Sequence, residues 1–130
     1  MQNPITIDQF FALFTGHWVD WDGYYGNQCE DLANFYSFAI GGQPFTGATA
    51  DLIYNQTQNG FYEQVKNDPT NYPGKGDIVV FNWPHVGICT GNNTNSSTVE
   101  LLEQNDPARS NAHIKLYPNY DGVIGWLHKV

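Results

Sequence analysis

A cysteine stands at the start of a predicted helix, directly after a glycine-rich acidic loop at residues 20–28. Asn27 is a good N-cap, and Glu30 three residues later completes a capping box, which places Cys29 near the second helical position. The sulfur would then lie beside unpaired backbone N–H groups and the positive end of the helix dipole. Both favour a thiolate, the nucleophilic form of cysteine, so the sequence predicts Cys29 as an activated nucleophile.

A cysteine nucleophile needs a base, and the base needs a group that orients it. His85 is the best candidate, because it follows Pro84 and opens a predicted strand at a sheet end that a helix N-terminus could face. Glu103 and Asn105 end the next predicted strand and alternate onto one face of it. If the two strands pair, a carboxylate and an amide would lie beside the imidazole and hold its tautomer. The alternative for each residue is a structural or solvent-facing role, which is also the role expected of the other histidines, His17, His113 and His128.

The acidic loop has the composition of a calcium site. Residues 20–23 read Asp-x-Asp-Gly, which is how a hard-cation loop begins, because Ca²⁺ takes several oxygen ligands and the glycine lets the chain turn back. Asp31 follows Asp20 by eleven positions, the separation of the first and last ligands in a twelve-residue calcium loop. The loop interior differs from an EF-hand, because it holds two glycines and Tyr24 stands where an oxygen side chain is common. We therefore expect calcium in a related geometry, with an acidic turn without metal as the alternative; zinc is not expected, because His and Cys do not cluster at zinc spacings.

Composition restricts the partners of this chain. Its 130 residues correspond to a single domain, residues 1–130, with 13 acidic and 5 basic residues and a formal net charge of -8. This balance disfavours nucleic-acid binding through phosphate contacts and attraction to an anionic membrane. No apolar run is long enough to cross a bilayer, so membrane insertion is not expected. A disulfide between Cys29 and Cys89 is disfavoured, because Cys89 lies in a strand-like run and is expected to be a small buried hydrophobe.

The elements that position these residues follow from hydrophobic periodicity. Amphipathic helices are expected at residues 4–14 and 28–40, and a short third helix at residues 49–58. In the second helix an inward-facing stripe is formed by Cys29, Leu32, Ala33 and Tyr36. Strand patterns then follow at residues 76–81, 85–90, 98–104, 113–117 and 123–128. Helices followed by sequential strands with short turns predict an α+β fold with a mostly antiparallel sheet.

Taken together, these segments resemble the cysteine, histidine-dependent amidohydrolase/peptidase (CHAP) family, in particular the catalytic domains of bacteriophage endolysins. The resemblance covers nearly the whole chain and rests on motifs in the family's order, at residues 20–32, 76–81, 85–88 and 103–105. It implies a papain-like α+β fold and hydrolysis of an amide bond in peptidoglycan. The enzyme would be either an N-acetylmuramoyl-L-alanine amidase or a peptide endopeptidase.

The resemblance also implies roles for individual residues. Cys29 would be the nucleophile and His85 the base, with Glu103 and Asn105 orienting the imidazole. The oxyanion hole would use Gln28 and the backbone N–H of Cys29. Calcium ligands would be the carboxylates and backbone carbonyls of Asp20, Asp22, Tyr24, Gly26 and Asp31.

Partners and location follow from the same resemblance. Residues 1–16 carry no Lys or Arg, so no secretory signal is expected; the protein would be made in the cytoplasm of a bacterial host and act on its wall after release. Phage endolysins usually add a wall-binding domain, so the chain would be an excised catalytic domain or reach the wall in another way. A different class, a calcium-dependent glycan-binding module, remains an alternative, because four Trp, eight Tyr and eight Phe could stack on sugars. Such a module has no use for the Cys, His and Glu-x-Asn set.

Overall fold

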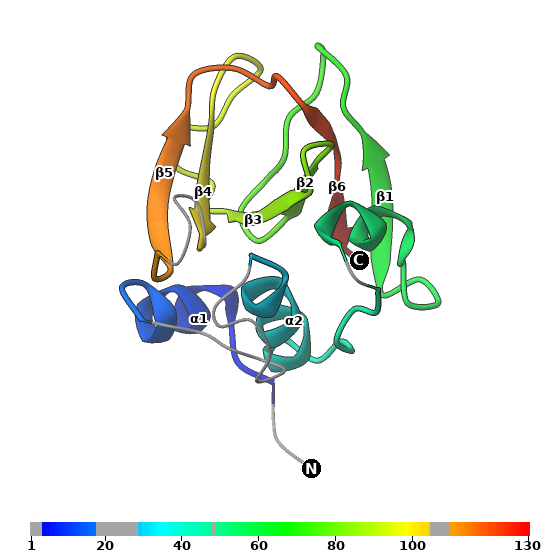
Figure 1. Cartoon of the computed structure of the whole chain (residues 1–130), viewed down its shortest axis with the longest axis vertical. Coiled ribbons are helices and arrows are strands. Elements are labelled where there is room, and N and C mark those ends of the chain that lie inside the picture. Colours follow the sequence, from blue (N-terminus) through cyan, green and yellow to red (C-terminus); the bar gives the residue numbers. More distant parts are fainter. Residues whose placement is uncertain (1–3, 18–28, 48, 105–109) are drawn as a thin grey trace.

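The computed structural model describes residues 4–17, 29–47, 49–104 and 110–130 (Figure 1). The helical elements of this part of the chain are α1 (Ile7–Phe14), α2 (Cys29–Ala39) and the 3-10 helix η1 (Ala50–Asn55). Its strands are β1 (Tyr62–Lys66), β2 (Ile78–Phe81), β3 (His85–Cys89), β4 (Val99–Glu103), β5 (His113–Tyr117) and β6 (Val123–Lys129).

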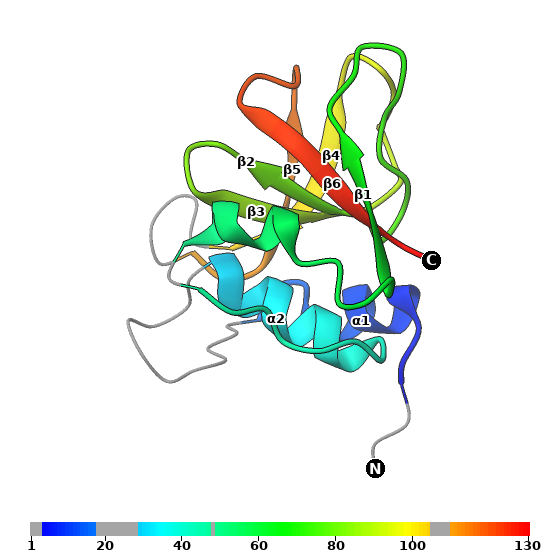
Figure 2. The ribbon, with the colours of Figure 1, turned by 90° about the vertical axis from the view of Figure 1, so that its right-hand side faces the viewer.

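The strands form one antiparallel sheet in the order β1-β6-β2-β3-β4-β5. Figure 2 shows α1 and α2 side by side beneath the sheet, with η1 between α2 and the strands. Helices that come first and cover one side of an antiparallel sheet make this an α+β fold, as the sequence predicts, and this agrees with the papain-like architecture that the resemblance implies.

A capping box sets the start of α1. The Thr6 hydroxyl accepts a hydrogen bond from the Gln9 N–H at 3.1 Å, and the Gln9 side chain accepts one from the Thr6 N–H at 2.9 Å. The helix therefore begins at Ile7, three residues later than predicted. Its buried Phe10 contacts the ring of Tyr36 on α2, with centroids 5.0 Å apart, and this contact joins the two helices.

The inward-facing stripe of α2 is confirmed: Cys29, Leu32, Ala33 and Tyr36 are all buried. The Tyr36 hydroxyl donates a hydrogen bond of 2.8 Å to the carbonyl of Gly76, just before β2. Gly76 has a φ of +89°, and a Cβ there would clash with Ile7 and lie 2.9 Å from the Tyr36 oxygen. Only glycine fits this close approach between helix and sheet, which fixes α2 against the central strands.

Both faces of the central strands are buried. On the helix side, Ile78, Val80, Val86, Ile88 and Leu102 pack against residues of α1 and α2. The opposite face has its own apolar cluster, made by Val79, Phe81, Cys89, Val99, Leu101, Val123 and Trp126. This double burial explains why β2 and β3 have almost continuous apolar sequences.

The structure adds one strand to the predicted elements and changes the type or the ends of others. The sequence did not predict β1, which pairs with the outer edge of β6; its apolar residues Tyr62 and Val65 do not alternate, and most of its side chains are exposed. The third helix is a six-residue 3-10 helix within the predicted range 49–58. Strands β2 to β6 occur where predicted, with ends that shift by one or two residues.

The expectation that the two cysteines form no disulfide is confirmed. Cys29 and Cys89 are both buried free thiols. No helix in the described part of the chain has the length and apolar character required to cross a bilayer.

Candidate active site

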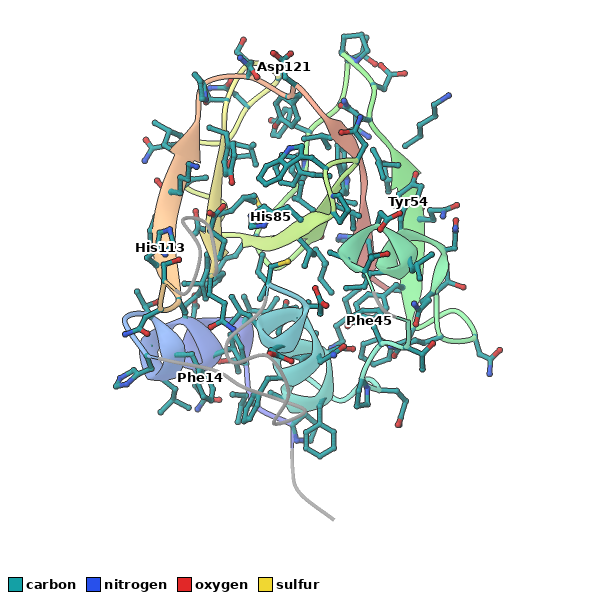
Figure 3. The ribbon with its side chains drawn as sticks, in the orientation of Figure 1. Phe14, Phe45, Tyr54, His85, His113 and Asp121 are labelled. Atoms are coloured by element: carbon teal, nitrogen blue, oxygen red, sulfur yellow. The ribbon has the colours of Figure 1, made fainter. Side chains whose placement is uncertain are left out.

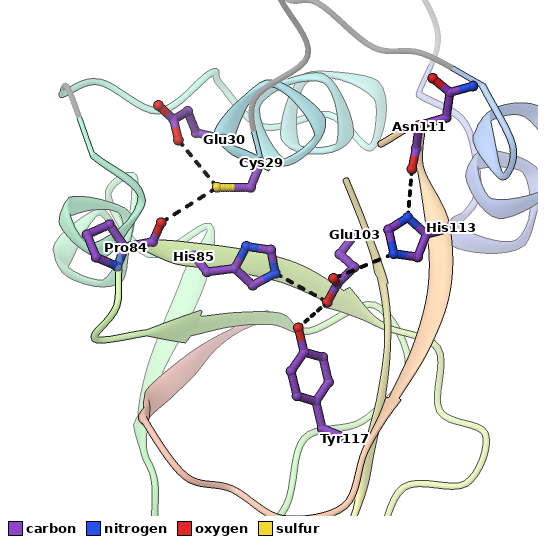
Figure 4. Close-up of polar contacts among 8 residues, drawn as sticks. All are labelled: Cys29, Glu30, Pro84, His85, Glu103, Asn111, His113 and Tyr117. Carbon is purple, nitrogen blue, oxygen red and sulfur yellow. Dashed lines mark hydrogen bonds and ion pairs between the residues drawn. The ribbon is translucent and has the colours of Figure 1, made fainter. Parts of the chain in front are cut away.

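Cys29 is the first residue of α2, and it lies against the start of β3. Its sulfur is 3.8 Å from the carbonyl oxygen of Pro84 (Figure 4). The backbone N–H of Val86 also donates a hydrogen bond to the sulfur. These two backbone groups belong to the residues on either side of His85. The thiol is therefore held at the end of β3 that carries the predicted base.

The electrostatic environment of the thiol differs from the sequence-based expectation. Burial and the carboxylate of Glu30, whose Oε2 lies 3.5 Å from the sulfur, raise the pKa of Cys29 to about 12. The N–H groups of Val86 and Glu30 lower this pKa but do not compensate. The helix start alone predicts a lowered thiol pKa and a thiolate. In the structure, desolvation and the adjacent negative charge of Glu30 raise the thiol pKa instead.

His85 opens β3, and its side chain is 3% exposed. The Trp83 ring stacks on the imidazole, with centroids 4.6 Å apart and an interplanar angle of 7°. Phe81 lies 5.5 Å away from the same ring. Aromatic contacts therefore fix the plane of the imidazole, and Figure 4 shows its ring between the sulfur of Cys29 and the carboxylate of Glu103.

Glu103 lies at the end of β4 and is fully buried. Its Oε1 is 3.2 Å from Nε2 of His85 and accepts a short hydrogen bond from the hydroxyl of Tyr117. The His85–Glu103 contact has the distance of an ion pair but not the alignment of a hydrogen bond. The predicted pairing of the two strands is confirmed, because β3 and β4 are neighbours with Ile88 opposite Leu102.

His113, for which the sequence favours a structural or solvent-facing role, also belongs to this cluster. It opens β5 directly opposite Glu103, and its Nε2 lies 3.7 Å from Glu103 Oε2. Figure 3 shows His85 and His113 on the strands that flank β4. A signal was present in the sequence, since Glu103 and His113 end and begin the two strands of one hairpin, which places them opposite each other.

Several predicted site residues lie outside the described part of the chain. These are Gln28 and Asn105, and the predicted calcium ligands Asp20, Asp22, Tyr24 and Gly26. The remaining predicted ligand, Asp31, is the third residue of α2 and is 1% exposed. Within the described residues, no three His, Cys, Asp or Glu side chains are grouped to hold a metal.

The two other histidines lie apart from this cluster. His17 is exposed after α1. His128 on β6 is half exposed, and its Nδ1 lies 2.7 Å from Oδ1 of the buried Asp77. The structure thus brings Cys29, His85 and Glu103 together from one helix and two adjacent strands.

This arrangement can perform proton transfer and nucleophilic attack. A carboxylate beside Nε2 of His85 favours the tautomer with the proton on that nitrogen, which leaves Nδ1 free to accept the proton of a thiol. The same carboxylate stabilises the imidazolium that forms. A thiol, a base and a buried carboxylate in this order are the components of acyl transfer through a covalent intermediate.

Sequence comparisons agree with the resemblance. The model of the CHAP domain family matches residues 18–105. The chain is 33% identical over 137 aligned positions to Endolysin LysK of Staphylococcus phage K. The match covers 98% of this chain but only 27% of LysK, so the chain corresponds to a part of that longer protein.

Solved structures share the fold. The crystal structure of the endolysin LysIME-EF1 superposes with a TM-score of 0.82 and 23% identity, over 96% of this chain and 64% of that one. Ly7917, determined with the hydrolyzing product of MDP, gives a TM-score of 0.66 and 16% identity, over 95% of this chain and 63% of its own.

Proposed function

Because this chain belongs to the CHAP domain family, we propose that it is a hydrolase that cleaves an amide bond in the peptidoglycan of bacterial cell walls. One observation carries the proposal. The Cys29 sulfur contacts the backbone on both sides of His85, and the buried Glu103 lies 3.2 Å from Nε2 of that imidazole. The similarity to Endolysin LysK supports the wall as the place of action, after release from a bacterial host.

In the proposed reaction, His85 takes the proton of the Cys29 thiol as the sulfur attacks the carbonyl carbon of the amide. A carbon–sulfur bond forms, the carbon–nitrogen bond breaks, and the imidazolium gives its proton to the leaving amine. Water then attacks the thioester with His85 as base, which releases a carboxylic acid and restores the thiol. Glu103 stabilises the imidazolium in both halves of the cycle, and Asn105 is proposed to assist it.

The oxyanion that forms on the carbonyl oxygen needs hydrogen-bond donors. We propose that the backbone N–H of Cys29 and the residue before it, Gln28, supply them. The position of Cys29 as the first residue of α2 supports this proposal, because the first N–H groups of a helix have no partner within the helix.

Two bonds in peptidoglycan fit this chemistry. An N-acetylmuramoyl-L-alanine amidase separates the glycan from the whole peptide, whereas an endopeptidase leaves part of the peptide attached to the sugar. Mass spectrometry of digested walls distinguishes these products directly.

Calcium is proposed to support the site through Asp31 and the loop before it. All of the proposed ligands are oxygen donors, which suits Ca²⁺, and Asp31 is a buried carboxylate in the first turn of α2. When bound, the cation would supply positive charge next to the start of the helix that carries Cys29.

The experiment that tests the function is the clearing of purified bacterial walls, followed as a fall in turbidity. The wild type should clear walls, and Cys29→Ala should bind them without clearing. If the wild type binds walls and releases no soluble fragments, the alternative of a glycan-binding module is correct. Comparable clearing by Cys29→Ala would instead show that the thiol is not the nucleophile.

A further inference from the structure

We infer that His113 is a positioning residue of this site, which holds the second carboxylate oxygen of Glu103 so that the first remains directed at His85. This inference rests on the proposed function, in which Glu103 stabilises the imidazolium of His85. It assigns His113 a role in the hydrolytic cycle although the residue does not contact the thiol in the described structure.

The two carboxylate oxygens of Glu103 differ in their hydrogen-bond partners. Oε1 accepts a hydrogen bond from Tyr117 and lies 3.2 Å from His85 Nε2. Oε2 is also buried, but in the described part of the chain it has no hydrogen-bond partner. A buried carboxylate oxygen without a donor is unfavourable, so the site gains from a group that can donate to it.

His113 is placed to be that donor. Its Nε2 lies 3.7 Å from Oε2, which is within ion-pair distance but beyond hydrogen-bond distance. An approach of about 0.8 Å would convert the contact into a hydrogen bond. The ring is on the strand paired with β4, in register with Glu103, so that a small change of side-chain torsion is sufficient.

The hydrogen bond of Nδ1 determines in which protonation state Nε2 of His113 can donate a hydrogen bond to Glu103. Nδ1 lies 2.7 Å from the backbone carbonyl of Asn111, which is only an acceptor, so this nitrogen carries a proton in the neutral ring. Nε2 then faces Glu103 with its lone pair. It carries a proton only in the imidazolium, and therefore protonation of His113 supplies the missing donor.

Exposure distinguishes the two imidazoles that share Glu103. The side chain of His113 is 33% exposed and can exchange protons with solvent, whereas that of His85 is 3% exposed. The described ionisable group in contact with His113 is Glu103 on β4, and the same carboxylate also contacts His85 on β3 and Tyr117 on β5. Lys115 lies on the same strand as His113, with its ammonium over the Tyr117 ring. On the adjacent segment, His17 is paired through its backbone with Ala112.

Two substitutions separate the donor from the size of the side chain. In His113→Gln the amide nitrogen reaches the position of Nε2 and donates without a charge; in His113→Asn the amide reaches only the position of Nδ1. Near pH 6, His113→Asn should lower the rate of wall clearing at saturating walls about tenfold, as expected for one hydrogen bond to a charged group. His113→Gln should stay within about twofold of wild type, because it restores the donor.

The pH profile supplies the readout that a purely structural role would not move. The ratio of wild-type to His113→Asn rates should fall toward one as the pH rises, because a neutral His113 with its proton on Nδ1 cannot donate from Nε2. The corresponding ratio for the Gln and Asn variants should stay constant. His128→Gln removes an imidazole on β6 that contacts the buried carboxylate of Asp77, and it should leave the rate and its pH profile unchanged.

Three results would overturn the inference: wild-type rates in a folded His113→Asn near pH 6, equal losses in the Gln and Asn variants, or a wild-type to Asn ratio independent of pH. A measurement that does not depend on wall clearing distinguishes a failure of this inference from a failure of the proposed function. In histidine-labelled protein, Glu103→Gln should shift the ring ¹⁵N resonances of His85 and His113 and leave those of His128 in place. If wild type fails to clear walls but these shifts occur, only the proposed function is wrong; an unchanged His113 resonance refutes the shared carboxylate.

Discussion

Replacing Glu103 by glutamine removes one negative charge from the site while it preserves the size and shape of the side chain. The amide oxygen can still accept the hydrogen bond from Tyr117, so the end of β4 should keep its structure. What disappears is the charge 3.2 Å from Nε2 of His85. We therefore expect a folded protein with a large loss of hydrolysis.

The size of the loss follows from the distance. Two unit charges 3.2 Å apart interact by about 5 kcal/mol at an effective dielectric constant near 20. This is the stabilisation that the imidazolium of His85 would lose, and solvent screens it little because both side chains are buried. Since about 1.4 kcal/mol corresponds to a factor of ten, the upper limit is a rate lower by between about 10³ and 10⁴. The amide dipole of glutamine retains a part, so we expect a loss of at least about 10².

The assay is the initial rate of wall clearing at equal protein concentration, together with the melting temperature. The melting temperature should stay within about 4 °C of wild type, since a neutral amide is easier to bury than a carboxylate. Glu100→Gln is the matched control: it lies on the same strand, where its carboxylate accepts hydrogen bonds from Thr90 and Asn93, and its rate should not change. A folded Glu103→Gln with more than about a third of the wild-type rate would refute the role of the charge, because the interaction would then be worth less than about 1 kcal/mol.

Four other predictions test the proposed chemistry. Cys29→Ser should fold and lose nearly all wall clearing, whereas Cys89→Ser should keep most of it; the reverse order would contradict the choice of nucleophile. Chelation should lower the melting temperature and the clearing rate, and Ca²⁺ should restore both better than Mg²⁺, with a stabilisation of about 2.7 kcal/mol at about 100 times the dissociation constant. Asp31→Asn should not respond to added Ca²⁺, and a calorimetric titration that shows no calcium binding at millimolar concentration would refute the site. Glu30→Gln should increase the alkylation of Cys29 by iodoacetamide severalfold near pH 8, because the Glu30 carboxylate raises the thiol pKa; mass spectrometry of the modified peptide measures this, and a slower reaction would contradict it. Burial raises the pKa of Cys29 and of Tyr62 to about 12, above their unfolded values of 9.0 and 10.0. The contribution of these two groups to stability should therefore be constant below about pH 9 and fall as the pH rises toward 12, and a melting temperature that rises between about pH 9 and pH 11 would contradict both shifts.

Local sequence patterns predict the order of the elements and the positions of the reactive side chains along them. The buried stripe of α2, the strand that begins at His85 and the strand that ends at Glu103 all occur where their patterns predict. These are local signals: apolar periodicity and capping act within a few residues, so they can be read without knowing the rest of the fold. The pairing of β3 with β4 was also accessible, because consecutive strands with a short connection usually lie side by side.

The environment of those side chains depends on contacts between segments that are distant in the sequence. The helix start predicts a thiolate at Cys29, but its pKa depends on what covers the sulfur and on the nearby carboxylate of Glu30, and their combined effect has the opposite sign. The edge strand β1 lacks a local pattern because its side chains are mostly exposed, so its place beside β6 depends on backbone hydrogen bonds to a segment far along the chain. In the same way, the convergence of His85, His113 and Tyr117 on one carboxylate comes from the register of three strands. Desolvation and cross-strand register are properties of the assembled sheet, and no single segment carries them.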